Sequence, residues 1–307
     1  MPQARSTTPV ATRFPGPHRR RLSALLAWVF VLELILAAAV PFDAALDRRA
    51  RPPQLVTPAR AQFSATSRSL VVGDRTVRLI GHGGPAGDRL LSRVASAVGG
   101  AIGAVEAFWG VDWSREIALV AAHTDEEFRA AAGGGPAAQW ADIAAVTVVD
   151  RVDAARRVAI GERIVFAPGA ANMTAGALRI VLIHELFHYA ARVDTAPDAP
   201  RWLTEGVADF VARPQAPVPA DALPVPLTLP SDADLDAPGS QRSLAYDRAW
   251  WFARFVADTY GAAKLRDLYL AVCGPGHTDV PTALHDVLAT EVPGVLVRWH
   301  EWLTHAR

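Results

Sequence analysis

The fold and the function of this chain depend on the stretch Ile180-Val-Leu-Ile-His-Glu-Leu-Phe-His-Tyr-Ala190. The run is long enough for a helix and has apolar side chains on nearly every side, so we expect it to pass through a hydrophobic core. Its polar members include His184, Glu185 and His188. Because residues four apart lie one turn above each other on one helical face, the two histidines can direct ring nitrogens to a single point. That point is a candidate metal position.

The spacing His-Glu-x-x-His on a helix is the signature of zinc-dependent peptidases. Two neutral imidazoles bind Zn²⁺ in such sites, and the glutamate beside the first histidine is the general base toward water. Zinc lowers the pKa of that water to about 7, so Glu185 would take its proton at neutral pH. The pattern fixes only three positions, and a polar stripe with satisfied partners in a core helix is the alternative interpretation.

A third ligand is expected from the segment that follows. Asp194 to Pro200 is rich in turn formers, and Trp202 to Phe210 is predicted to form a second helix. The short connection predicts that this helix runs antiparallel to the first. A catalytic zinc site usually has three protein ligands and one open position, which Glu205 would complete. Asp209 lies on the same face, where it can accept the outer N–H of a zinc-bound histidine.

The two segments together resemble the gluzincin metallopeptidases, and more narrowly the bacterial peptidase-MA-like proteins. The resemblance is carried by His184-Glu-Leu-Phe-His188 and by Trp202-Leu-Thr-Glu-Gly-Val-Ala-Asp209, and it covers 178–213 well. It implies a zincin-like fold of two lobes with Zn²⁺ held by His184, His188 and Glu205. It also implies that Asp209 supports a zinc histidine. By the same resemblance, Tyr246 donates a hydrogen bond to the developing oxyanion.

Asp194 is the competing third ligand. It comes six residues after His188, as in metzincin-type sites, where a glycine midway lets the chain turn back. The midway position here holds Ala191, whose Cβ disfavours the left-handed conformation that this turn needs. Glu205 is therefore the preferred third ligand.

Length and composition limit the classes of function. The chain has 307 residues, of which 51% are hydrophobic, and this suffices for a large buried core. The formal net charge is zero, so no nucleic-acid partner is predicted. Cys273 is the single cysteine, which excludes an intramolecular disulfide.

The N-terminal region favours a position at a membrane. Residues 1–21 form a basic tail that we expect to be disordered. Leu22 to Val40 is apolar apart from Glu33, and its length is close to the ~20 residues that a membrane-spanning helix needs. Arginines before it should stay in the cytoplasm, which predicts a single-pass anchor in the cell membrane with the catalytic part extracytoplasmic. Secretion after signal cleavage near Ala39 is the alternative.

The predicted fold class is α+β, with an N-terminal mixed sheet and active-site helix and a C-terminal helical lobe. A linker at 41–65 leads to the zincin-like lobe at 66–213, for which a hairpin, two helices and three strands are predicted before the metal helix: 70–80, 90–109, 117–121, 125–131, 144–149 and 158–167. The last strand should bend at Gly161. In gluzincins the strand before the site lies at the sheet edge and pairs with an extended substrate, which by resemblance falls on Arg163 to Ala167. An ordinary core strand is the alternative.

A proline-rich loop at 214–242 is predicted before the C-terminal helical lobe at 243–307. Repeated prolines there predict neither helix nor central strand, and the segment is expected to rim the cleft. Aromatic and apolar periodicity then predicts helices at 244–260, 264–272, 283–289 and 293–305, with Gly261 as the C-cap of the first.

The leading hypothesis is a membrane-anchored zinc metallopeptidase that acts on a peptide or protein substrate outside the cytoplasm. A non-catalytic anchored module that keeps the zincin fold for binding or structure is the alternative. A helical membrane protein in which the motif arises by chance is the third interpretation. The sequence does not separate an endopeptidase from an aminopeptidase.

Overall fold

The main sheet has five strands with mixed pairing. The computed structural model describes residues 66–140, 142–219 and 227–306. The strand order is β1-β2-β3-β7-β4, in which the two central pairs are parallel and the two outer pairs antiparallel. The strands span Thr66–Val72 (β1), Arg75–Gly81 (β2), Glu116–Ala121 (β3), Ala145–Val148 (β4) and Arg163–Phe166 (β7). With its largely helical remainder, the chain is an α+β protein, as predicted.

The first two strands form the predicted hairpin. Gly73 in the turn has φ 60°, a left-handed conformation that glycine adopts without the steric cost of a Cβ. Every residue of β1 is paired with β2, from Thr66 opposite Gly81 to Val72 opposite Arg75. The Gly-Asp turn between two apolar runs therefore predicted the hairpin correctly.

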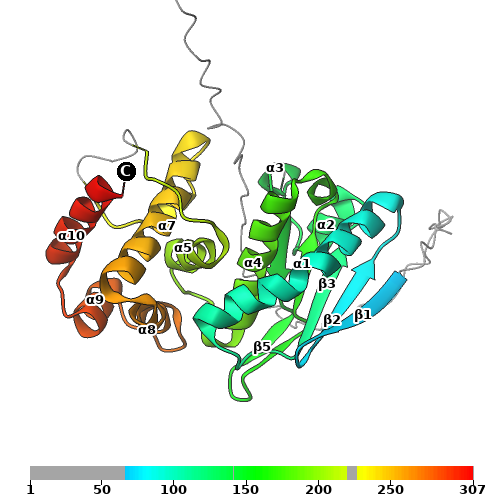
Figure 1. Ribbon diagram of the computed structural model, residues 1–307, viewed down its shortest axis with the longest axis horizontal. Coiled ribbons are helices and arrows are strands. Elements are labelled where there is room, and N and C mark those ends of the chain that lie inside the picture. The colour runs from blue at the N-terminus through cyan, green and yellow to red at the C-terminus, as the bar shows by residue number, and fades with distance from the viewer. Residues whose placement is uncertain (1–65, 141, 220–226, 307) are drawn as a thin grey trace, which may run out of the picture.

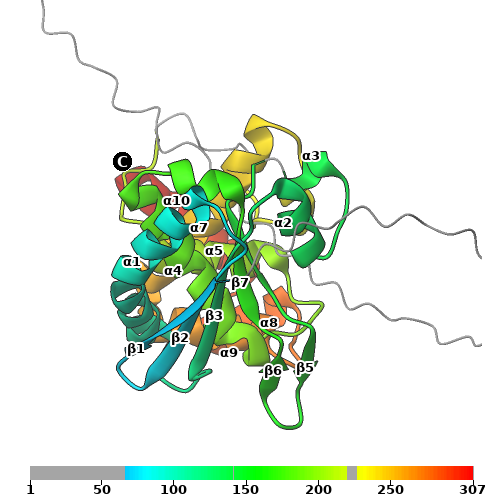
Figure 2. The ribbon, with the colours of Figure 1, turned by 90° about the vertical axis from the view of Figure 1, so that its right-hand side faces the viewer.

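Helices cover both faces of the sheet. On one face, α1 and α4 share a core with Ile117 and Leu119 of β3, and on the other, Phe128 and Trp140 from α2 and α3 pack with Val120. Figure 2 shows α1 and α4 on one side of the strands and α2 on the other. The bounds of these helices are Pro85–Trp109 (α1), Asp125–Ala131 (α2), Ala137–Trp140 (α3) and Ala175–Ala191 (α4). Short 3-10 turns at Pro168–Asn172 (η1) and Arg192–Asp194 (η2) flank α4.

The single bent strand expected at 158–167 is two strands in two sheets. Gly161, with φ 72°, separates β6, at Val158–Ile160, from β7. β6 pairs with β5, at Arg151–Asp153, in a hairpin that projects beyond the main sheet (Figure 2). β7 lies between β3 and β4, and its residues from Ile164 to Phe166 are buried on both faces. The interpretation of this segment as an ordinary core strand is therefore confirmed. The alternative, that Arg163 to Ala167 forms the edge strand, was wrong, and β4 is at that edge.

The described residues after α4 are largely helical and lie beside the sheet. Figure 1 shows α7 to α10 at one end of the molecule and the sheet at the other, with α4 and α5 between them. The same view looks along α5 while α4 lies across it, so these two helices cross, whereas antiparallel neighbours were expected. The four predicted C-terminal helices, α7 to α10, are confirmed. The helices after α4 span Arg201–Ala212 (α5), Asp232–Leu235 (α6), Ser240–Tyr260 (α7), Ala262–Cys273 (α8), Val280–Leu288 (α9) and Val292–His305 (α10).

The proline-rich segment departs from its prediction at one place. α6 is a single helical turn, although the segment was expected to contain no helix. Ser231 and Asp234 form a reciprocal capping box, which stabilises a short turn in a part of the segment that contains no proline. Before α6, the segment is held on the helices by the Ala216 carbonyl, which accepts from Arg254, and by the Val218 N–H, which donates to Ala306.

One helix of the described part of the chain, α1, is long and apolar enough to cross a membrane. Its buried residues, among them Leu90, Val94 and Val98, pack in the core that it shares with α4. Length and composition of this kind are common to core helices and membrane spans. The predicted tail, the anchor at Leu22 to Val40 and the linker lie outside the described residues.

Candidate metal centre

His184 and His188 lie one turn apart on α4, as their spacing predicts. The helix begins after Thr174, whose hydroxyl oxygen accepts the Ala177 N–H, and it is buried throughout from Val181 onward. The two histidines are therefore inside the protein, with exposed fractions of 3% and 2%. Their Nε2 atoms are 2.9 Å apart, so both rings direct a nitrogen to one position.

Glu205 brings a carboxylate from α5 to the same position. Its Oε2 lies 3.3 Å from Nε2 of His184, and its Oε1 lies 3.7 Å from Nε2 of His188. All three residues are buried, and one ligand atom from each lies within 4.8 Å of the others. Among the described residues, these three side chains form the group of His, Cys, Asp or Glu residues that could hold a metal ion.

The spacing of these atoms fits a small tetrahedral ion. Ligands about 2.0–2.1 Å from Zn²⁺ at tetrahedral angles are about 3.3–3.4 Å from one another. The distances of 2.9, 3.3 and 3.7 Å lie on both sides of that value. Two imidazole nitrogens and one carboxylate are a donor set that zinc uses when a position is left for water. The group could therefore hold a metal ion, and the donor set favours zinc.

Asp209 orients the first histidine. Its Oδ1 lies 3.0 Å from Nδ1 of His184, which places the ring proton on Nδ1 and leaves Nε2 as the ligand atom. Burial raises the pKa of Asp209, but the charges of Arg213 and His184 outweigh burial and lower it. The carboxylate therefore stays ionised beside the ring. The contact of Asp209 with His184 that the sequence predicted is therefore present.

Two residues that the sequence analysis missed extend this chain of contacts. Arg213 donates to Oδ2 of Asp209 at 3.0 Å and to Oδ1 of Asp247 on α7 at 2.9 Å. The Arg213 guanidinium also lies 3.8 Å from the centroid of the Trp250 ring, a cation–π contact. The signal in the sequence was the spacing of Arg213, four residues after Asp209 on one helical face.

The electrostatics of the centre favour a positive charge between the rings. Burial alone lowers the pKa of His184, but hydrogen bonds to Asp209 and Glu205 and the charges of these carboxylates raise it well above its usual range. A buried site that draws a proton onto an imidazole has more negative than positive charge around it. A divalent cation would neutralise this excess in place of the proton, which is a second way in which the residues fit a metal ion.

Glu185 follows His184 directly on α4 and is fully buried. The Thr147 hydroxyl, from β4, lies 2.7 Å from Oε2 of Glu185 and 2.9 Å from its backbone carbonyl oxygen. Thr147 was also missed by the sequence analysis. Its signal was a hydroxyl within the otherwise apolar strand from Ala145 to Val148.

The open edge of the sheet is next to Glu185. Within the described residues, no strand pairs with the outer side of β4. The Ala167 N–H donates to the Ala144 carbonyl at 2.9 Å, so the pairs alternate such that Ala145 and Thr147 direct their N–H and C=O groups away from β7. The strand that carries the Glu185 contact therefore also presents backbone groups outward.

Tyr246 lies near the centre from the third helix. It is buried on α7, and burial together with the charge of Glu205 raises the pKa of its phenol. The hydroxyl is therefore a neutral donor at physiological pH. α7 approaches α5 closely at Gly206, where an added Cβ would lie 2.5 Å from the Ala249 carbonyl oxygen.

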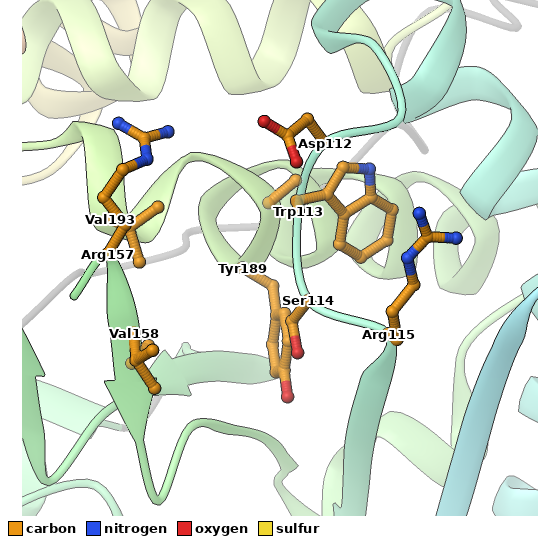
Figure 3. A pocket seen from close by; sticks show the side chains of 10 residues that line it. Asp112, Trp113, Ser114, Arg115, Arg157, Val158, Tyr189 and Val193 are labelled. Carbon is orange, nitrogen blue, oxygen red and sulfur yellow. The ribbon is translucent and has the colours of Figure 1, made fainter.

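Asp194, the competing third ligand, is not part of the group. It lies in η2 after α4, and its carboxylate forms an ion pair with Arg157 at 2.6 Å. Arg157, the partner of Asp194, lines a separate pocket of about 380 Å³. Figure 3 shows Tyr189, Arg115 and Arg157 around that pocket. The two arginines are paired with Asp74 and Asp194.

No protein-family model and no curated protein sequence matches this chain. The chemistry of the centre is therefore derived from its own residues. These are two imidazoles and a carboxylate at one position, a buried carboxylate beside them and a second carboxylate behind one ring.

Proposed function

We propose that this chain is a zinc-dependent peptide hydrolase of zincin-like, two-lobed architecture. The observation that carries the proposal is the convergence of His184, His188 and Glu205 with the buried Glu185 adjacent to them. His184, His188 and Glu205 would hold the ion. Zn²⁺ bound there would supply a Lewis acid that polarises a carbonyl and lowers the pKa of water to about 7.

The residues of the chain divide the remaining work. Glu185 takes the proton of the attacking water and returns it to the leaving nitrogen, which is general base and then general acid catalysis. Asp209 keeps His184 in one tautomer through the 3.0 Å contact at Nδ1. The neutral phenol of Tyr246 donates a hydrogen bond to the developing oxyanion, a contribution that can be worth about 10²-fold in rate.

An extended peptide is the substrate class that this arrangement favours. A peptide that adds as a further strand to β4 would bond to the N–H and C=O groups of Ala145 and Thr147. Its scissile bond would then lie near Glu185, because Thr147 contacts that carboxylate at 2.7 Å. By resemblance, Arg163 to Ala167 was expected to pair with the substrate. We assign this role to the neighbouring strand β4 instead.

The proposed place of action is the outer side of a membrane. Leu22 to Val40 has the length of a membrane span, and arginines precede it. The centre would then face the extracytoplasmic space on a single-pass anchor, or be secreted after cleavage near Ala39.

The test is metal analysis combined with cleavage of a peptide library by the full-length protein in detergent. We expect about one zinc per chain and cleavage by the wild type, and zinc without cleavage for Glu185→Gln. Glu205→Gln should lose the zinc, while His285→Ala, at an exposed histidine that pairs with Glu291, should lose neither. Cleavage at the wild-type rate by Glu185→Gln refutes the mechanism. Zinc without any cleavage by the wild type favours a binding module.

A further inference from the structure

The Thr147 hydroxyl, from β4, contacts the buried carboxylate of Glu185. Thr147 has an exposed fraction of 3%, so little water can reach this contact and compete with it. Its oxygen lies 2.7 Å from Oε2 of Glu185, a distance typical of a hydrogen bond from a hydroxyl to a carboxylate. The strand otherwise presents Ala145 on the same face, so Thr147 is a polar exception in an apolar surface.

The single proton of this hydroxyl has two acceptors within reach, the Glu185 carboxylate and the Glu185 backbone carbonyl at 2.9 Å. Donation to an ionised carboxylate is the stronger bond, and a dry environment increases the difference. The hydroxyl therefore donates to one carboxylate oxygen and restrains the orientation of the Glu185 side chain. A glutamate side chain otherwise turns about three bonds.

Thr147 also lies where the substrate of the proposed reaction would bind. Its backbone N–H and C=O are directed to the open side of β4, while its side chain is directed to α4. One residue thus joins the strand that would receive the peptide to the group that would take the proton. The backbone contacts do not depend on the side chain, so binding and proton transfer can be separated by substitution.

We propose that Thr147 is a positioning residue for Glu185, whose hydroxyl holds the carboxylate in the orientation in which it accepts the proton of water. This inference depends on the proposed function. It assigns the hydroxyl to the catalytic step and the backbone of the same residue to peptide binding. Removing the hydroxyl should therefore lower kcat and leave KM nearly unchanged.

The test uses the peptide from the library that the wild-type full-length protein cleaves best. Thr147→Val keeps the shape of the side chain and removes the donor, and kcat should fall by about 10- to 100-fold, the loss typical of one hydrogen bond to a charged group. KM should stay within about twofold of wild type. Thr147→Ser restores the hydroxyl, and kcat should return to within about threefold of wild type.

Thr195→Val is the matched control. The Thr195 hydroxyl donates to the Ala191 carbonyl of the same helix α4 at 2.8 Å and lies 2.8 Å from the Tyr269 hydroxyl. This control loses a threonine hydroxyl that bonds to α4 and should retain wild-type kcat. Bound zinc and the melting temperature are measured for every variant. If Thr147→Val does not fold, Thr147→Cys replaces it, since a thiol is a weak donor of similar size.

The outcomes separate the inference from the proposed function. A wild type that cleaves the peptide, with Thr147→Val or its cysteine replacement at the same kcat, overturns the inference alone. Loss of zinc from Thr147→Val also overturns it, because the residue would then act on the ligands. A wild type that binds no zinc and cleaves nothing overturns the proposed function and the inference with it. A lower kcat with unchanged KM and zinc, rescued by serine, supports the inference.

Discussion

Gly206 follows the proposed ligand Glu205 at a close approach of α5 to α7, so Gly206→Ala tests how the centre depends on helix packing. The added Cβ would lie 2.5 Å from the Ala249 carbonyl oxygen and 2.7 Å from its carbon. Ordinary van der Waals contact begins at 3.4 Å, so the two helices must separate by about 0.9 Å, the difference between 3.4 and 2.5 Å. The obstacle is backbone, which cannot rotate away as a side chain can.

The expected cost follows from this displacement. Overpacking a well-packed contact costs about 1–3 kcal/mol, which for a domain of this size lowers the melting temperature by on the order of 5 °C. A shift of about 0.9 Å also exceeds the ~0.2 Å tolerance of metal–ligand distances, so the zinc affinity should fall. Differential scanning fluorimetry with and without zinc, and competition with a chelating dye, measure the two effects.

Gly103→Ala is the control for this prediction. Gly103 lies in α1, and a Cβ added there meets nothing within 4 Å. Alanine in a helix interior is favoured over glycine by about 0.5–1 kcal/mol, so Gly103→Ala should raise the melting temperature slightly and leave zinc binding unchanged. If Gly206→Ala melts like the wild type and binds zinc as tightly, then α7 does not constrain the position of Glu205 and the reasoning is wrong.

Three further predictions concern the charges of the centre. Asp209→Ala should weaken zinc binding by about 10- to 100-fold, because His184 loses the partner at Nδ1, and competition with a chelating dye measures it; unchanged affinity contradicts the role of Asp209. In the metal-free protein the folded-state pKa of His184 is raised above its ordinary 6.5, so its contribution to stability is present below pH 6.5 and is lost as the pH rises through the folded pKa. Urea titrations of the metal-free protein should therefore show this loss, and His184→Gln should abolish it. Zinc should raise the melting temperature at neutral pH, because it binds the folded state and not the unfolded one, and His184→Gln should show no such rise.

The helices of this fold were largely predictable from the sequence, because their signals are local. The all-round apolar run at Ile180 to Ala190 predicted a buried helix, and aromatic periodicity predicted α7 to its last residue, Tyr260. The His-Glu-x-x-His spacing placed two imidazoles on one face without any tertiary information. The prediction of Glu205 required the second motif, Trp202 to Asp209, as well. α5 brings the carboxylate of Glu205 to the same position as the two imidazoles.

The order of the strands could not be predicted, because it is set by pairings between distant segments. Val158 to Ala167 has the apolar pattern of one strand, but the positive φ of Gly161 divides it, and the two halves join different sheets. The edge strand is the one that pairs with a single neighbour, and the residues of β4 and β7 do not indicate which of the two strands that is. The contacts of Thr147 and Asp247 were missed for the same reason, since each partner lies on another element.

The proposed centre joins the sheet to the C-terminal helices through one continuous series of contacts. Thr147 on β4 bonds to Glu185 on α4, and His184 on the same helix bonds to Asp209 on α5. Arg213 then bonds to Asp209 and to Asp247 on α7. A metal ion between α4 and α5 would close this series at its middle, where two helices cross and no disulfide is available to hold them. We therefore expect the ion to stabilise the packing of the C-terminal helices against α4, in addition to supplying the chemistry of the centre.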